Sequence, residues 1–146
     1  MGCDIHLHIE IKVKGNNEWQ HYNHPNGIYA GSNSRRNYTL FAKMADVRNE
    51  DKEIEPICYP KGLPEDITLV TKLDHERDNF HHESWLNLEE IEKLEDWWNQ
   101  QQWYKRGDAS TYFEEYFGYL FGNGFCEHTL KINNLQDVRF VFWFDN

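Results

Sequence analysis

Four residues that could do chemistry alternate along the start of the chain. Asp4, His6, His8 and Glu10 stand two residues apart, and every position between them is isoleucine or leucine. Successive side chains of a β-strand point to opposite faces, so this alternation predicts a strand with one polar face and one apolar face. Imidazole nitrogens and carboxylate oxygens bind metals and also transfer protons. We therefore expect a row of two carboxylates and two imidazoles on one side of this strand.

A divalent metal, zinc or manganese, is the cofactor that this row predicts. Neighbouring positions on one strand face lie about 6 to 7 Å apart, so one ion reaches only some of the row and needs ligands from elsewhere. His6 and Glu10 are the candidate catalytic acid–base residues beside a metal-bound water. Asp74, His75 and Asp78 lie in the same polar segment as a pair of adjacent histidines. By residue type, the candidate metal ligands are Asp4, His6, His8, His81, His82 and Asp145.

A small anionic or nucleotide-like ligand is the partner that the basic and aromatic residues suggest. An arginine fork binds a phosphate or carboxylate through two hydrogen bonds, and an indole ring offers a stacking face. Each basic residue taken singly also fits a surface ion pair. The candidate ligand-binding residues are Arg35, Arg36, Lys61, Trp85 and Arg139.

Two other interpretations of the first strand remain open. The polar row fits the solvated face of an antiparallel sheet, although histidine is neither a common solvating residue nor a strong strand former. A Cys–His hydrolase built on Cys3 fits less well, because Asp4 adjoins the thiol and a nucleophilic thiol needs electropositive surroundings. The sequence contains no nucleophile-elbow, phosphate-loop or dinucleotide-binding motif.

Length, charge and cysteine content set the broad class of the protein. The 146 residues fit a single domain spanning 1–146, and a 16% share of aromatic residues indicates an ordered core. A formal net charge of -10 argues against direct DNA binding, because contacts to phosphates need a basic surface. Three scattered cysteines form no disulfide framework. The first residues have neither the basic nor the apolar region of a signal peptide, and no apolar run approaches about 18 residues. We expect a cytoplasmic protein without a membrane partner, and its oligomeric state stays open.

The periodicity predicts an α+β fold. We expect a mainly antiparallel sheet that includes the N- and C-terminal strands, with about three helices packed on one side of it. The predicted strands cover residues 3–14, 18–22, 126–132 and 137–145, with a turn at residues 15–17 in the first hairpin. The predicted helices begin near residues 37, 88 and 111, and residues 67–73 fit either a short helix or an extended piece. Residues 23–36 and 74–85 are predicted to be polar loops.

Several blocks of the sequence are shared with one group of proteins. The chain opens with MGCDIH, continues with RNYTLFA and DVRN within residues 36–49 and GLPED at 62–66, and closes with DVRFVFWFDN. Together these blocks resemble a group of small, largely uncharacterised proteins of bacteriophages and prophages. The resembling blocks touch both ends and the middle of the chain.

The resemblance implies a phage accessory protein of the host cytoplasm that counters host defence. The group's signature includes Asp4, His6, Glu10, the Arg36–Asn37 pair and Asp145, whereas His8 and the His81–His82 pair are less characteristic of it. Lys61 stands where relatives are expected to carry arginine. Combined with the polar row, the resemblance leads to a small divalent-metal-dependent hydrolase of a phosphoester or nucleotide-like metabolite. The alternative is a binding protein without turnover that sequesters a nucleotide signal or blocks a host defence protein.

Overall fold

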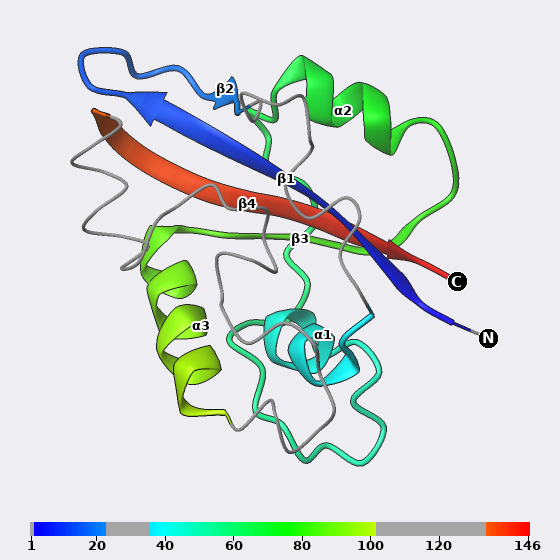
Figure 1. Cartoon of the computed structure of the whole chain (residues 1–146). Helices are drawn as coiled ribbons and strands as arrows, with labels where there is room; N and C mark the ends of the chain where they lie inside the picture. Colours follow the sequence, from blue (N-terminus) through cyan, green and yellow to red (C-terminus); the bar gives the residue numbers. More distant parts are fainter. Residues whose placement is uncertain (1, 23–35, 102–133) are drawn as a thin grey trace.

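A four-stranded antiparallel sheet forms the centre of the protein. The computed structural model describes residues 2–22, 36–101 and 134–146. The described strands are β1 (Asp4–Val13), β2 (Gln20–His21), β3 (His81–Leu86) and β4 (Leu135–Asp145), in the order β2-β1-β4-β3. The first and last strands pair along their whole length, and three described helices accompany the sheet (Figure 1). The predicted α+β class, with both terminal strands in one antiparallel sheet, is therefore confirmed.

The apolar row of β1 lies on the face of the sheet that packs in the hydrophobic core. Its four aliphatic side chains stand opposite Val138, Phe140, Phe142 and Phe144 of β4, and all of these are buried. Helix α1 (Tyr38–Ala45) and helix α3 (Leu88–Gln100) cover this face in Figure 1 and contribute buried residues to the same cluster. Burying apolar area on this scale is the main source of stability for such a fold.

Both core helices begin at the asparagines that the sequence indicates as caps. The Asn37 side chain accepts a hydrogen bond from the Leu40 amide at 3.0 Å. Asn87 accepts from the Glu90 amide at 2.9 Å, and the Glu90 carboxylate accepts from the Asn87 amide at 3.0 Å, which completes a capping box. These bonds satisfy amides that would otherwise lack partners at a helix start.

Replacing Asn87 by alanine is expected to lower the free energy of unfolding by about 1 kcal/mol, because α3 loses its side-chain cap. Urea unfolding followed by circular dichroism measures the change. Asn87→Ser is the matched control, since serine also caps and should change stability by only a few tenths. If the alanine and serine variants lose the same free energy of unfolding, the side-chain cap contributes nothing.

Helix α2 (Leu69–His75) lies on the other face of the sheet, so the prediction that the helices share one side is wrong for this element (Figure 1). Only Thr71 of α2 is buried, whereas Leu69, Val70 and Leu73 are exposed. Apolar periodicity therefore carries no information about where α2 packs. Polar contacts to the polar row of β1 hold it in place instead.

Strand β3 corrects a second expectation, since residues 74–85 were predicted to be a loop. Only Ser84 and Leu86 of β3 are buried, so the sequence shows no run of alternating apolar residues there. The strand forms through backbone pairing with β4, and its register shifts between His81 and Ser84. His82 in this irregular stretch has a φ of 55°.

The first hairpin follows the prediction in part. The turn at residues 15–17 is confirmed, with the Asn16 amide donating to the Val13 carbonyl at 3.0 Å and Gly15 at a φ of 89°. The returning strand β2 covers two residues rather than the predicted 18–22. The helix predicted from residue 111, the strand predicted at 126–132 and most of the predicted 23–36 loop lie outside the described residues. No helix in the described ranges combines the length and apolar character needed to cross a membrane.

Candidate functional site

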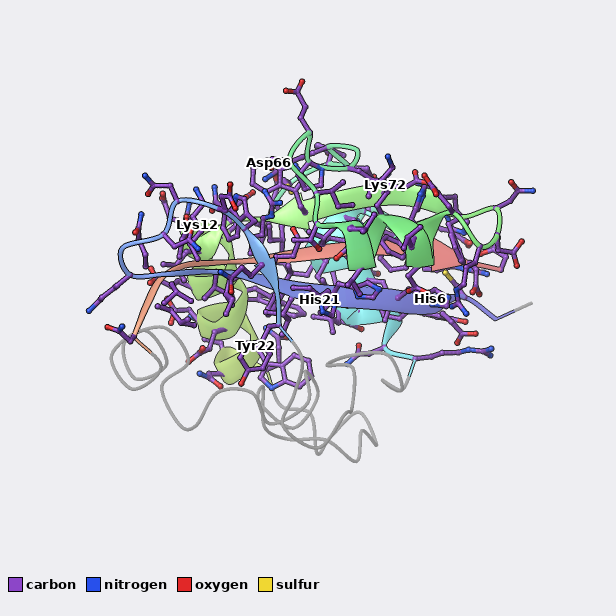
Figure 2. All side chains as sticks on the ribbon, turned by 90° about the horizontal axis from the view of Figure 1, so that it is seen from above. His6, Lys12, His21, Tyr22, Asp66 and Lys72 are labelled. Carbon is purple, nitrogen blue, oxygen red and sulfur yellow. The ribbon has the colours of Figure 1, made fainter. Side chains whose placement is uncertain are left out.

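The polar row of β1 faces α2, and its pairing with β4 sets its neighbours. Asp4 stands opposite Asp145, His6 opposite Trp143, and Glu10 opposite Arg139. Directly paired residues share a sheet face, so these side chains lie together on the side that α2 covers. His6 and His21 both lie beside α2 when the sheet is viewed from above (Figure 2).

Glu10 is fully buried and anchors the start of α2. One carboxylate oxygen accepts from Nε and Nη2 of Arg139, at 2.8 and 2.6 Å. The other accepts from the amide and hydroxyl of Thr68 and from the hydroxyl of Thr71, at 2.9, 2.5 and 2.9 Å. Both oxygens are occupied inside the protein, so this geometry favours an anchoring role for Glu10 over the predicted acid–base role.

Arg139 is likewise committed to partners inside the protein. Besides Glu10, it binds the Asp66 carboxylate through Nη1 at 2.7 Å and the Asp66 carbonyl through Nη2 at 3.1 Å. Its guanidinium lies 4.1 Å from the centre of the Trp19 ring, and only 3% of the residue is exposed. These contacts favour a structural role for Arg139 over the predicted binding of a ligand anion.

His6 and Asp145 form an imidazole–carboxylate pair. Nε2 of His6 lies 2.5 Å from Oδ2 of Asp145, and the two side chains keep 28% and 36% of their surfaces exposed. The imidazole packs against Phe80, with ring centres 5.0 Å apart. Because the carboxylate holds Nε2, Nδ1 of His6 has no hydrogen-bond partner among the described residues. The structure therefore brings two of the predicted site residues together and leaves one imidazole nitrogen open for chemistry.

His8 belongs to a chain of hydrogen bonds that crosses the pocket wall. Nε2 of His8 lies 2.7 Å from Oδ2 of Asp74, and Nδ1 lies 2.9 Å from Nε2 of His21. On its other oxygen Asp74 pairs with Arg77 at 2.6 Å. Burial lowers the pKa of His8, although the hydrogen bond and charge of Asp74 act in the opposite direction. A neutral His8 donates from Nε2 to the carboxylate, which can only accept, and accepts from His21 at Nδ1.

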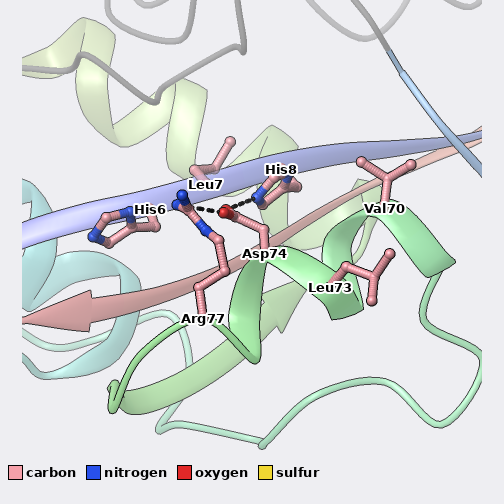
Figure 3. A pocket seen from close by; sticks show the side chains of 7 residues that line it. All are labelled: His6, Leu7, His8, Val70, Leu73, Asp74 and Arg77. Carbon is pink, nitrogen blue, oxygen red and sulfur yellow. Dashed lines mark hydrogen bonds and ion pairs between the residues drawn. The ribbon is translucent and has the colours of Figure 1, made fainter.

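A pocket of about 570 Å³ opens between β1 and α2 (Figure 3). Its walls carry His6 and His8 from the strand, and Val70, Leu73 and Asp74 from the helix. Arg77, just beyond the helix, reaches back over the pocket towards the two histidines in Figure 3. The strand side thus has two imidazoles, and the helix side has a carboxylate, a guanidinium and two apolar side chains.

The remaining metal-ligand candidates lie apart from this pocket. Asp4 pairs with Arg36 at 2.6 Å, and this hydrogen bond lowers the pKa of Asp4. The His81 ring stacks near Phe144, which faces the core side of the sheet, whereas His6 faces α2. Across residues 2–22, 36–101 and 134–146, no group of three or more His, Cys, Asp or Glu is placed to hold a metal ion. The predicted convergence of the adjacent histidines on His6 is therefore not observed.

Three of the five predicted ligand-binding residues line a second pocket of about 720 Å³, and Arg35 lies outside the described residues. Lys61 of this pocket lies 4.0 Å above the Trp85 ring and pairs with Glu90 at 2.5 Å. Trp19 and Arg139 form a similar cation–ring pair on the pocket wall. The fifth residue, Arg36, remains with Asp4 at the far end of β1.

Arg77 and His21 are site residues that sequence reasoning did not single out, and Asp74 was noted only for its type. Nothing in the sequence links them to the first strand, because residues 8 and 74 meet only when α2 folds over the sheet. The one available signal was the local pair Asp74–Arg77, three residues apart, which is the spacing of an ion pair on a helix.

The buried, neutral His8 predicts a pH-dependent stability. Its pKa in the folded protein lies below the ordinary value of 6.5, so the unfolded chain binds the proton more readily. The free energy of unfolding should therefore fall as the pH drops from 7 to 5, because protonation favours the unfolded chain. Urea unfolding at a series of pH values measures this dependence. The slope of the free energy of unfolding against pH should be smaller for His8→Gln than for wild type.

His82 is the matched control, since burial lowers its pKa as well, with His81 adding to that shift. Its more exposed position predicts a weaker effect of His82→Gln on the slope. If the free energy of unfolding of His8→Gln depends on pH as steeply as that of wild type, the neutral state of His8 is contradicted.

Comparison of the chain with family models, curated proteins and solved structures gave no match.

Proposed function

We propose that the protein hydrolyses a phosphoester or phosphoanhydride bond of a nucleotide-like metabolite in the pocket between β1 and α2. The observation that supports this proposal is that one pocket is lined by His6, which pairs with Asp145, and by the chain His8–Asp74–Arg77. An oriented imidazole supplies acid–base catalysis, and a guanidinium supplies charge for a phosphoryl group.

His6 acts as the general base. Its Nδ1 accepts a proton from the attacking water while the new bond between water oxygen and phosphorus forms and the bond to the leaving oxygen breaks. Asp145, bonded at Nε2, orients the ring and stabilises the imidazolium that results. A carboxylate in this position also keeps the lone pair on Nδ1, where the water must be bound.

Arg77 binds the phosphoryl oxygens. A guanidinium has five N–H donors. The contact with Asp74 is made through Nη2, so other N–H donors remain for a second anion. Asp74 connects this arginine to the buried His8 and thereby restrains where the guanidinium can lie. His8 is a positioning residue in this scheme, because only 5% of it is exposed.

The pocket favours a substrate whose leaving group departs as an anion. One accessible imidazole can remove the proton from water, but in-line displacement puts the leaving oxygen on the opposite side of phosphorus. A nucleoside phosphate or an aryloxide leaves without protonation, so one base suffices. Val70 and Leu73 provide an apolar wall for a base or ring, and a volume of about 570 Å³ accommodates a ligand of nucleotide size.

The divalent metal and the biological setting stay predictions. The proton transfers described above use only residues of the chain. A bound zinc or manganese ion would add Lewis acidity at the phosphoryl oxygens. The resemblance to phage proteins suggests that the metabolite is a signal of host defence and that hydrolysis removes it in the host cytoplasm.

A second candidate function is sequestration of a nucleotide without turnover. The pocket that contains Trp19 and Trp85 favours it, because it has two indole rings and the cation Lys61. Bases stack on indole rings and phosphates pair with cations, so this pocket can hold a nucleotide without catalytic groups. Blocking of a host protein by the acidic surface belongs to the same non-catalytic class.

Product analysis separates the two functions. Purified protein is incubated with cyclic and linear nucleotides, dinucleoside polyphosphates and an aryl phosphodiester, with chelator in one arm and added Mn²⁺ or Zn²⁺ in another. Chromatography of altered nucleotide supports hydrolysis, and the chelator arm shows whether a metal contributes. Nucleotide that is recovered intact but bound supports sequestration. Absence of both conversion and binding across the panel would overturn the proposed function.

A further inference from the structure

The adjacent histidines at the start of β3 converge on one point. Neighbouring residues of a regular strand point to opposite faces. Here the register shift after His81 and the left-handed φ of 55° at His82 bring both rings to the same side. Their Nδ1 atoms lie 2.6 Å apart, and the ring planes are nearly perpendicular, at 82°. A left-handed backbone at a residue other than glycine costs free energy and is concentrated at functional positions.

A second contact sets the tautomer of one ring. Nε2 of His81 lies 2.9 Å from the side-chain oxygen of Asn146, which can only accept a hydrogen bond. Nε2 of His81 therefore has the proton, and Nδ1 of His81 accepts a hydrogen bond from Nδ1 of His82. Metal binding through both Nδ1 atoms replaces that hydrogen bond, with the proton of His82 moving to its Nε2. A histidine that binds a metal through one nitrogen commonly donates from the other nitrogen to a carbonyl or carboxylate oxygen.

The surroundings favour a cation. Asp46 and Glu83 both lie within electrostatic range of His82, and their charges act to raise its pKa. Burial and the neighbouring His81 act more strongly in the other direction and lower the pKa of His82. His82 is exposed, which leaves the approach to the pair open to solvent. The exposed His82 beside His81 therefore lies in the field of two carboxylates.

We propose that His81 and His82 chelate a transition-metal dication such as Zn²⁺, Ni²⁺ or Cu²⁺ through their Nδ1 atoms. Imidazole suits all three of these ions, and water completes the coordination. At zinc–nitrogen distances of about 2.0 to 2.1 Å, tetrahedral geometry separates two ligand nitrogens by about 3.3 Å. Chelation would widen the present separation of 2.6 Å, and the side chains would have to rotate for it.

This site is independent of the proposed hydrolytic pocket. The His81 ring contacts Phe144, which stands opposite the core-facing Ile5, whereas His6 lies on the α2 side. Metal binding at the histidine pair is measured without reference to any substrate. Failure of the hydrolysis assay and failure of metal binding are therefore separate results.

Titration calorimetry of the full chain without an affinity tag, with ZnCl₂ as the probe, tests the proposal. Wild type should bind zinc, and His81→Asn and His82→Asn should each weaken the affinity by about tenfold or more. Asparagine is chosen because it tolerates the left-handed backbone of residue 82. Asn146→Ala should weaken binding by a smaller factor, because it removes only the bond that orients His81.

His75→Asn is the matched control, since His75 lies in the same stretch of chain but pairs with Glu83 and packs on Phe80. Its zinc affinity should equal that of wild type. Electron paramagnetic resonance of the Cu²⁺-loaded protein should show two imidazole nitrogens in wild type and fewer in His82→Asn. Zinc binding that survives both histidine substitutions unchanged, or a wild-type chain that binds no zinc, would overturn the proposal.

Discussion

Replacing Arg139 by methionine is expected to lower the free energy of unfolding by about 3 to 5 kcal/mol. Methionine retains most of the side-chain length but removes the charge that pairs with Glu10 at 2.6 Å. Glu10 has no exposed surface, so its carboxylate would stay buried with only the Thr68 and Thr71 donors. A buried charge without its counter-ion is among the costliest defects in a folded protein. Urea unfolding at pH 7 measures the loss.

The double variant Arg139→Met with Glu10→Gln is the internal control. It removes both charges, so it should be more stable than Arg139→Met alone. Arg36→Met is the matched single control, because Arg36 pairs with Asp4 in an exposed position and its loss should change stability little. Similar losses for Arg139→Met and Arg36→Met would contradict the anchoring role of the buried pair.

Replacing His6 by asparagine is expected to lower kcat by about 10²- to 10⁴-fold on whichever nucleotide the screen identifies as a substrate. The change removes the nitrogen that accepts the proton from water, while Arg77 and the apolar wall remain to bind the substrate. KM should therefore change much less than kcat. Steady-state kinetics with wild type and variant at equal concentrations measure both constants.

Two further variants make this result specific. Asp145→Asn should also lower kcat, because an amide can donate to Nε2 and shift the proton of His6 to Nδ1, the nitrogen that must accept. His75→Asn changes a histidine that packs on the same Phe80 ring but lies outside the pocket lining, so its kcat should stay near the wild-type value. A His6→Asn protein with full activity would exclude His6 as the base.

The terminal strands were predictable because their side chains alternate. In β1 the four aliphatic positions are buried and the polar row lies on the other face, as the spacing indicates. In β4 apolar residues occur on both faces, which predicts a central strand covered on both faces. The strand lies between β1 and β3, and its apolar residues on both faces are buried. The caps of α1 and α3 were predictable for a similar reason, since capping depends on residues three positions apart.

The site was predictable only in part. Sequence reasoning identified His6, His8 and Asp145 as candidates, and the antiparallel register of β1 and β4 brings His6 to Asp145. It could not identify the partner of His8, because Asp74 reaches it through α2, which no apolar pattern directs to that face. Pairing between residues 66 positions apart is set by tertiary packing rather than by local spacing.

The adjacent histidines show the opposite case. Their residue type suggested metal binding. Residues 74–85 were predicted to be a loop, and a loop could have brought the two histidines to His6 on the first strand. Strand β3 instead pairs His81 with Phe144 and holds the histidine pair against the core side of the sheet. A backbone irregularity at one residue, His82, then decides where both rings point. Such irregularities depend on strand register, which the sequence does not encode locally.

The polar attachment of α2 has a consequence for motion. This helix buries only Thr71 and is held by the oxygens of Glu10 and by the bond from Asp74 to His8, while its leucines and valine stay exposed. Only one residue of the helix is itself buried, so its amide hydrogens should exchange with deuterium well before those of α3, whose apolar face is packed in the core. Helix α2 can thus open locally while the sheet stays folded. Such opening would let a molecule of nucleotide size enter and leave the pocket without global unfolding.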